Sequence, residues 1–563
     1  MDESPSADRL SDLSTRYWRF QCHEFPLNAI LAGEDVPDAV LFRESQEDYD
    51  RRDRAAGDML RELETFAPDS LTGQDRLTYR LLREELEDLR SQHQVMAHLR
   101  PALLPMGPDY GTVLFANTAN IGDARSAARY VERLASLPGY IRDVEGCLRS
   151  GHARGLRYPG VVLEAAIATV RSSMAGPVDE LPWYAPFKRS AARGRDAVDR
   201  HGRQALELIR GELLPALADY VGLLEGPLSA TARSSVACID APLGRDFYRA
   251  QVRHHTTTGM SPEAIHEIGQ AEVARLDAEI EAVAAEAGFT GDVAGYRSFL
   301  ANDPQFIAAS KESLRETAES LCKRIDKRIP AFFGRIPRIT YGVESMAEST
   351  SVHMPPAYAE PNPADGTAPG IFWMTGLPSR CPIYMLVPLA LHEAWPGHLM
   401  HIALLQEMAD LPAFRRHGAL KYAGYIEGWA LYCERLGAEM GLYETPHQQY
   451  GRLEMEMWRA LRLVVDTGIH WFGWSRNRAI DTMMQRLAMP RGTIEAEVNR
   501  YVALPGQALA YQLGNLTIRS LRERAERALG ENFNLRAFHD LLMAAGAVSL
   551  PLLEEFVSDA LDL

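Results

Sequence analysis

The sequence predicts a mainly helical fold with two lobes and one small β-sheet. From about residue 45 to 235, apolar residues recur three and four positions apart, a spacing that favours amphipathic helices. Between residues 335 and 385 the chain is rich in Pro, Gly, Thr, Tyr and Val, and short runs bounded by turn residues indicate a few strands. The helical pattern returns after Ile383 and continues to the C-terminus. Of the 563 residues, 46% are hydrophobic, which is enough to build a large core.

The N-terminal part contains two especially clear helical patterns. Residues 74–92 and 196–224 place their apolar side chains on one face of a helix. The first residues, MDESPSADRLSDLS, are acidic and contain neither a basic start nor an apolar run. We therefore expect a solvated tail at this end and no secretory signal.

A long helix is expected over residues 263–287, directly after Ser261 and Pro262. Serine caps the free N–H groups of a first turn, and proline suits that turn because it has no N–H to leave unpaired. Farther along, residues 370–376 (GIFWMTG) are the strongest strand candidate, next to the helix that follows. We place a lobe boundary near residue 240, so that residues 1–240 form a helical lobe and 241–563 a catalytic lobe of one integrated unit.

Composition narrows the possible partners and compartment. The formal net charge of −16 opposes binding to phosphate backbones, so nucleic acid is not an expected partner. The longest apolar run, residues 383–391, is too short to cross a bilayer, and no membrane association is expected. The six cysteines are scattered and form no CxxC pair, which is typical of thiols in a reducing compartment. The expected location is the cytoplasm.

The chemistry is expected in the segment LVPLALHEAWPGHLMHIALL. His392, Glu393 and His398 lie in an apolar helix, and burying such groups without partners is costly. Zinc metallopeptidases use two histidines at i and i+4 with a glutamate beside the first as general base. Here the second histidine is at i+6, which on a straight helix is ~120° around the axis and ~9 Å along it. We expect His401, by contrast, to be a structural residue.

Pro396 and Gly397 offer a way to bring the two histidines together. Proline removes the hydrogen bond that its position would donate to the carbonyl of His392, and glycine tolerates unusual backbone angles. We therefore expect the helix to be disturbed between the histidines, in the form of a widened, π-like turn that returns His398 to the side of His392.

A catalytic zinc ion needs a third protein ligand and an open position for water. Glu427 and Glu434 are seven residues apart in YAGYIEGWALYCERLGAEMG and so share a helix face. Either carboxylate could be the ligand, and the other could accept a hydrogen bond from a histidine N–H. We favour Glu427 as the ligand, because Gly428 beside it allows close approach.

Further polar residues lie in the apolar helical segments that follow. Asp466 and His470 are four residues apart, with Asp466 a candidate for a supporting or alternative ligand, although the two side chains could also pair with each other and brace the helix. Hydroxyl or imidazole donors such as Tyr501, Tyr511 or His470 could stabilise the oxyanion formed when water attacks an amide carbonyl.

At these residues the chain resembles the bacterial domain-of-unknown-function 885 family, which is grouped with the zincin-like metallopeptidases. The matching stretches run from about residue 240 to 520: GRDFYRAQVRHHTTTGMSPEAIHEIG (244–269), HEAWPGH (392–398), YIEGWALYCE (425–434), RLVVDTGIHWFGW (462–474) and LPGQALAYQLG (504–514). The resemblance implies a helical zincin-like fold, with Glu427 as third zinc ligand and Tyr511 at the oxyanion. It also implies that the strand 370–376 lies along the substrate.

The leading hypothesis is a zinc-dependent hydrolase of short peptides or N-acyl amino acids. His392, His398 and Glu427 would hold the zinc ion, Glu393 would act as general base, and Tyr511 together with His470 would stabilise the oxyanion. Two alternatives stand beside it: a non-catalytic binding protein of zincin-like shape, and a metal hydrolase that acts on non-peptide amides or esters.

Overall fold

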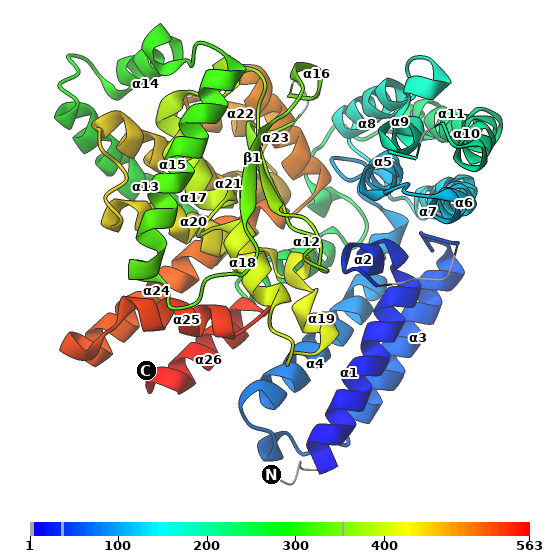
Figure 1. Ribbon diagram of the computed structural model, residues 1–563, viewed down its shortest axis with the longest axis horizontal. Helices are drawn as coiled ribbons and strands as arrows, with labels where there is room; N and C mark the ends of the chain where they lie inside the picture. Colours follow the sequence, from blue (N-terminus) through cyan, green and yellow to red (C-terminus); the bar gives the residue numbers. More distant parts are fainter. Residues whose placement is uncertain (1–4, 35–38, 193, 352–353) are drawn as a thin grey trace.

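The protein is mainly helical, as expected. The computed structural model describes residues 5–34, 39–192, 194–351 and 354–563. Helices account for 71% of it, and its strands form one three-stranded sheet. In Figure 1 helices α5–α11 gather at the upper right, α1–α4 lie at the lower right, and the sheet and later helices occupy the left.

The helices of the N-terminal 240 residues are α1 (Pro5–Glu24), α2 (Pro26–Leu31), α3 (Gln46–Leu63), α4 (Gly73–Gln94), α5 (Pro108–Thr118), α6 (Ala124–Leu134), α7 (Leu137–Ala153), α8 (Gly160–Ser173), α9 (Ala185–Arg189), α10 (Asp196–Leu208) and α11 (Leu214–Leu223). The next group is α12 (Gly244–Thr256), α13 (Pro262–Glu286), α14 (Val293–Asn302), α15 (Lys311–Phe332) and α16 (Glu348–Ser351). The C-terminal group is α17 (Leu386–Glu393), α18 (His398–Gln406), α19 (Ala413–Arg416), α20 (Ala423–Glu439), α21 (Pro446–His470), α22 (Arg476–Met484), α23 (Arg491–Ala503), α24 (Ala510–Leu529), α25 (Leu535–Ala544) and α26 (Leu550–Leu561).

The helices predicted from local pattern are found where they were expected. α4 covers residues 74–92, and α10 continues through a π-helical turn at 209–213 into α11, so that residues 196–223 are helical. α13 begins at Pro262, and the Ser261 hydroxyl accepts a hydrogen bond from the Ala264 N–H at 3.2 Å. The serine therefore caps the helix as predicted.

The solvated N-terminal tail is a wrong prediction from residue 5 onward; residues 1–4 lie outside the described part. Residues 5–24 form α1, and Leu10, Leu13 and Tyr17 on one of its faces are buried. These three residues are spaced three and four apart, so the helical stripe is present in the sequence among acidic neighbours. The apolar stripe therefore outweighs the high charge of the segment, because it packs against the rest of the protein.

The sheet consists of β1 (Tyr341–Ser345), β2 (Ala357–Glu360) and β3 (Gly370–Met374) in the order β1-β3-β2. β3 is parallel to β1 and antiparallel to β2, with Phe372 opposite Val343 on one side and Ala359 on the other. Residues 370, 372 and 374 are buried and alternate with half-buried ones. A Cβ on Gly370 would lie 2.9 Å from the Leu399 side chain, so β3 rests directly on α18. The small sheet therefore lies beside the histidine-bearing helices.

Two large hydrophobic cores hold the helices together. The first combines buried residues of α1, α3 and α4 with those of the sheet, α15, α17–α20 and α24–α26. The second combines residues of α5–α8, α10 and α11 with those of α13, α14 and α21–α23. Each core therefore contains residues from before and after residue 240, while the lobe boundary at that position stays a prediction.

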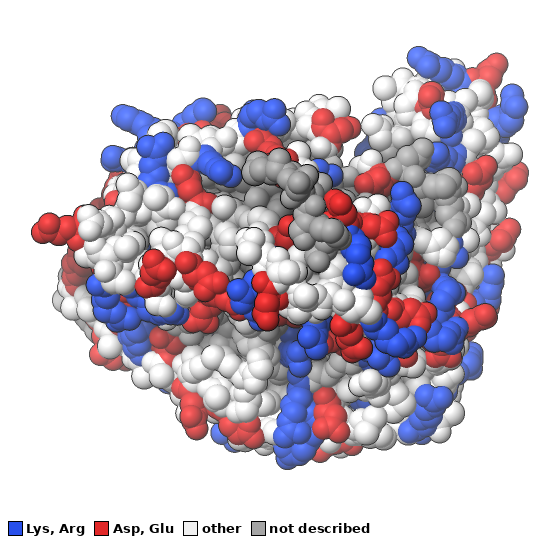
Figure 2. Space-filling model, turned by 90° about the horizontal axis from the view of Figure 1, so that it is seen from below, with Lys and Arg blue, Asp and Glu red and all other residues white. Residues whose placement is uncertain are grey.

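Surface charge, cysteine pairing and helix hydrophobicity bear on the predicted partners and compartment. On the face seen in Figure 2, acidic and basic residues are interspersed rather than gathered in one region of a single sign. The six cysteines are unpaired, and five of them are buried. Among the described helices, none combines the length and apolarity that a membrane crossing requires.

A buried carboxyl group in α21 makes the stability of the fold sensitive to pH. Glu454 is 3% exposed, and its Oε1 accepts a hydrogen bond from the Ala488 N–H at 2.6 Å. Burial raises its pKa from the ordinary 4.5 to about 7. The folded protein therefore favours the protonated form, and this contribution to stability is complete below pH 4.5 and is lost as the pH rises to about 7.

We predict that Glu454→Gln, which cannot ionise but keeps an acceptor for Ala488, removes this dependence. Relative to the native protein, the free energy of unfolding of the variant should rise between pH 4.5 and 7.5, measured by urea denaturation. Glu495→Gln on the surface of α23 is the control. A difference between Glu454→Gln and the native protein that does not change with pH would contradict the assignment.

Candidate metal centre

The two histidines of the predicted centre lie on either side of a complete break between helices. α17 ends at Glu393, and α18 begins at His398. Ala394 (ψ −131°) and Gly397 (ψ −137°) have backbone angles outside the helical range, and the Trp395–Pro396 bond is cis. The predicted π-like turn is therefore wrong, because a π-turn continues the helix whereas here the chain leaves it for four residues.

Close backbone contact fixes the shape of this break. A Cβ on Gly397 would lie 1.9 Å from the carbonyl oxygen of His392, so only glycine allows the chain to fold back this tightly. From α20, the buried indole of Trp429 donates a hydrogen bond to the carbonyl of Pro396 at 2.9 Å. The turn that brings His398 back toward His392 is therefore held both by its own backbone and by the neighbouring helix.

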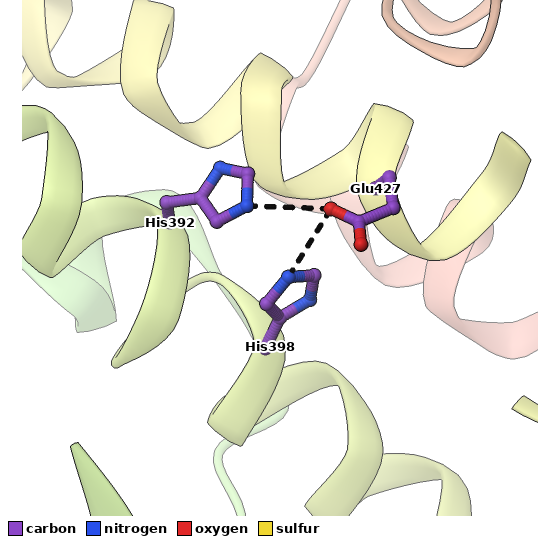
Figure 3. A group of neighbouring side chains, drawn as sticks. All are labelled: His392, His398 and Glu427. Atoms are coloured by element: carbon purple, nitrogen blue, oxygen red, sulfur yellow. Dashed lines mark ion pairs between the residues drawn. The ribbon is translucent and has the colours of Figure 1, made fainter. Parts of the chain in front are cut away.

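The break and α20 bring three side chains to one point (Figure 3). Glu427 Oε2 lies 3.4 Å from Nε2 of His392 and 3.4 Å from Nε2 of His398. One ligand atom from each residue lies within 4.8 Å of the other two. The side chains of His392 and His398 are 4% and 12% exposed, and that of Glu427 is 22% exposed, so the cluster is largely buried but reachable from solvent.

The spacing of these atoms fits a metal ion better than a set of hydrogen bonds. A hydrogen bond between charged groups is about 2.7–2.9 Å long, shorter than the observed 3.4 Å. Ligand atoms about 2.0–2.1 Å from a tetrahedral zinc ion are about 3.4 Å apart. Glu427 Oε2 is buried without a hydrogen-bond partner among the described residues, so an acceptor atom is directed at the shared point and left unsatisfied. Two imidazoles and a carboxylate are a donor set that zinc accepts.

Glu434 supports the first histidine from behind. Its Oε1 lies 2.8 Å from Nδ1 of His392, and both residues are buried. A proton on Nδ1, donated to Glu434, leaves the lone pair of Nε2 directed at Glu427, which is the arrangement that a metal-binding histidine requires.

The opposite charges of the histidines and carboxylates shift the pKa values of His392 and Glu427. Burial alone would lower the pKa of His392, but the carboxylates of Glu427 and Glu434 raise it to about 9, so a metal ion would replace the proton on its Nε2. Burial likewise acts to raise the pKa of Glu427, yet the charges of His398 and His392 hold it well below its usual range. Glu427 is therefore ionised and available as a ligand.

Glu393 and Tyr511 lie beside this cluster. Burial raises the pKa of Glu393, and the charges of His392 and His398 act against that rise. Burial also raises the pKa of Tyr511, as does the neighbouring Glu427, so its hydroxyl stays protonated. A half-buried carboxyl group and a phenol donor are therefore available next to the three converging atoms.

The contact between α20 and α24 explains why Tyr511 is near Glu427. A Cβ on Gly428 would lie 2.5 Å from the Cα of Gly514, and one on Gly514 would lie 1.7 Å from the carbonyl oxygen of Gly424. The missing side chain of Gly428 thus makes room for the backbone of α24, and not for a metal ion bound to Glu427. Tyr511 precedes Gly514 by one helical turn, so this crossing sets its position.

Asp466 and His470 are not part of the cluster. Asp466 is fully buried and accepts hydrogen bonds from the Tyr248 hydroxyl at 2.7 Å and the Gly506 N–H at 3.1 Å. His470 accepts from the Cys238 N–H through Nδ1 at 3.2 Å and donates to the carbonyl of Tyr501 through Nε2 at 2.9 Å. Both ring nitrogens are in use, which argues against the predicted oxyanion role of His470 and against metal binding by Asp466.

The resemblance implies that strand β3 lies along the substrate, and this stays a prediction. β3 is the central strand, and its backbone groups pair with β1 on one side and β2 on the other. It therefore has no open edge over 370–374 on which an extended peptide could pair. His401, expected to be structural, is buried against the rings of Tyr425 and Trp429.

Sequence reasoning missed Arg459 on α21, whose charge acts on Glu393, Glu434 and Glu427. It is 5% exposed. A signal was available in the sequence WRALRLVVD, where two arginines three residues apart interrupt an apolar helix.

We predict that Gly397→Ala lowers the free energy of unfolding by about 2 kcal/mol or more, because the new methyl group collides with the carbonyl of His392. Urea denaturation measures this change. Gly492→Ala, in an exposed first turn of α23 where a Cβ meets nothing within 4 Å, is the matched control and should be neutral or slightly stabilising. Equal losses in both variants would contradict the argument.

A second prediction concerns Glu434→Gln, which keeps an acceptor for His392 but removes the negative charge. Zinc affinity should fall about 10- to 100-fold, because the charged partner makes the imidazole a stronger ligand. Competition with a zinc-binding dye measures it. Glu439→Gln, on the same helix but paired with Arg522 at the surface, should leave the affinity unchanged. An unchanged affinity in Glu434→Gln would remove Glu434 from the centre.

Comparisons with known proteins agree on the fold and the family. The family described as "Bacterial protein of unknown function (DUF885)" matches residues 26–557. The crystal structure of a "putative lipoprotein" from Colwellia psychrerythraea has a TM-score of 0.92 at 26% identity and covers 99% of this chain and 100% of that chain. A "putative lipoprotein of unknown function" from Shewanella oneidensis has a TM-score of 0.75 at 17% identity, covers 97% and 99%, and shows the fold alone. No curated protein matches. Since the family match spans almost the whole sequence, the chain belongs to the bacterial DUF885 family.

Proposed function

We propose that this protein is a zinc-dependent hydrolase of short peptides or N-acyl amino acids. The observation that carries the proposal is the convergence of ligand atoms of His392, His398 and Glu427 within 4.8 Å of one another, with Glu427 Oε2 at 3.4 Å from each Nε2, the separation of two ligands on a tetrahedral ion. Catalytic zinc sites use three protein ligands and keep one position open for water or substrate. The solvent access of Glu427 supports a catalytic rather than a closed structural site.

His392, His398 and Glu427 would hold the ion. When bound, zinc acts as a Lewis acid, polarising a carbonyl group and lowering the pKa of a nearby water. Glu434 keeps His392 in the tautomer that has Nε2 free. The neighbouring side chains then carry out the proton transfers and stabilise the developing charge.

Glu393 takes the proton of the attacking water on a carboxylate oxygen and passes it to the nitrogen of the leaving amine. Its raised pKa suits a group that must both accept and return a proton. The phenol of Tyr511 donates a hydrogen bond to the carbonyl oxygen as negative charge develops there. Tyr511 acts without His470, because both nitrogens of His470 are bonded elsewhere.

A zincin-like architecture and a cytoplasmic location are part of the same proposal. We infer a zincin-like, two-lobed architecture because a His-Glu pair, a second histidine and a glutamate on a following helix repeat the zincin ligand set with altered spacing. A cytoplasmic location is supported by the six unpaired thiols. The two solved relatives carry a lipoprotein description, so fractionation of cells with an antibody against this protein is the test of location.

The function is tested by metal analysis and by hydrolysis of a substrate panel. Protein purified from zinc-replete medium should contain one zinc ion per chain, measured by inductively coupled plasma mass spectrometry, and His392→Ala should contain none. Glu393→Gln should keep the zinc and lose at least about 100-fold in kcat, because general base catalysis contributes on that order.

The panel contains peptides, N-acyl amino acids, non-peptide amides and esters, so that the class of substrate is measured in the same experiment. A native protein that takes up no zinc sinks the proposal. A protein that binds zinc and hydrolyses nothing in the panel favours the non-catalytic binding protein. One that cleaves only esters or non-peptide amides favours the alternative of a metal hydrolase that acts on such substrates.

A further inference from the structure

A group of buried arginines next to the candidate metal centre has too few carboxylate partners. Arg459 and Arg462 on α21 are 5% and 4% exposed, and Arg500 on α23 is also largely enclosed. Glu497 forms ion pairs with Arg462 at 3.3 Å and Arg500 at 3.0 Å. One carboxylate therefore serves two guanidinium groups, and Arg459 is left over.

Arg459 forms no ion pair with any carboxylate in the described part of the chain, although Glu427 and Glu434 act on it from a distance. Its hydrogen bonds within the described chain go to the backbone carbonyl of Met455 at 3.3 Å and the sulfur of the same residue at 3.1 Å. Its Nε is buried without a partner, and the guanidinium lies over the Trp458 ring at 4.7 Å. A buried cation without an opposite charge in contact is costly, so an arginine kept in this state is expected to meet an anion during function.

Arg459 lies one helical turn before Arg462 on α21, close enough to the metal centre for charges there to act on it. Burial lowers its pKa, and among the groups that act against this are Glu434, Tyr511 and Glu427. The neighbouring Arg462 stacks on the ring of Tyr511 at 4.3 Å and also has a buried N–H group, Nη1, without a partner. Two neighbouring buried cations therefore each carry an unpaired N–H group, and one of the two stacks on the phenol that would contact the scissile carbonyl.

We propose that Arg459, assisted by Arg462, binds the free α-carboxylate of the substrate. This rests on the proposed hydrolase function. In a peptide or an N-acyl amino acid with a free C-terminus, the α-carboxylate is one residue away from the last amide bond, so an arginine beside the metal centre recognises it while that bond faces Glu393. A planar guanidinium matches a carboxylate with paired hydrogen bonds. The protein therefore removes the C-terminal residue of its substrates rather than cutting internally.

Two matched libraries test this assignment: N-acetyl amino acids with a free carboxylate, and the same compounds as carboxamides. The native zinc protein should hydrolyse the acids at least about 30-fold more efficiently than the amides, the loss that follows when one partner of a buried charged pair is removed. In Arg459→Gln the preference should fall below about threefold, through a higher KM for the acids. Arg459→Lys keeps the charge and should restore part of the preference.

Arg452→Gln is the matched control. Arg452 lies on the same helix seven residues earlier and is similarly buried, but it already pairs with Glu456 at 3.0 Å. This variant should lose stability and keep the native ratio of acid to amide hydrolysis, which separates carboxylate recognition from general damage to α21.

A binding measurement separates failure of this inference from failure of the hydrolase proposal. Thermal stabilisation of native protein and Arg459→Gln by each library needs no turnover. Stabilisation by the acids alone, lost in Arg459→Gln, supports carboxylate binding even if nothing is cleaved. Equal stabilisation by acids and amides, or none by either, overturns it, whatever the hydrolysis assay finds.

Discussion

The candidate centre depends on one backbone contact, that of Gly397 with the carbonyl of His392. Through it the chain ends one helix and begins the next within four residues, which turns a separation of six positions into convergence of two imidazoles. Trp429 holds the same turn from α20, the helix that carries Glu427. The ligand helix and the turn are thus locked to each other, so the three donor atoms are placed by packing in the interior rather than by a surface loop.

Much of this arrangement could be predicted from the sequence because it depends on local pattern. Helical spacing, the Ser261 cap and the strand of residues 370–374 all follow from short-range rules and are present in the structure. The disturbance around Gly397 was also predictable, since proline removes a helical hydrogen bond and glycine tolerates unusual backbone angles. Its form was not, because whether a helix widens or breaks is decided by contacts with a distant segment, here Trp429.

The roles of buried polar residues were harder to predict. Asp466 and His470 have the spacing of functional residues. In the structure, however, Asp466 accepts hydrogen bonds from the Tyr248 hydroxyl and a backbone N–H, and His470 bonds to two backbone groups. No local sequence pattern predicts backbone partners from distant segments. Arg459 is the opposite case, a buried residue that belongs to none of the predicted motifs and forms no ion pair among the described residues. The central place of β3 likewise depends on long-range pairing order, which local pattern leaves open. Composition misled at the N-terminus, where charge concealed the apolar stripe of α1.

The glycine pair at the crossing of α20 and α24 has a consequence for how this family can diverge. Neither Gly428 nor Gly514 leaves room for a methyl group, so any larger residue must push apart the two helices that carry Glu427 and Tyr511. Such a shift would change the spacing between the Glu427 carboxylate and the Tyr511 phenol. If the proposed hydrolase function holds, relatives with bulky residues at both positions would lose this spacing, and reading the two positions would separate hydrolases from non-enzymes within the family.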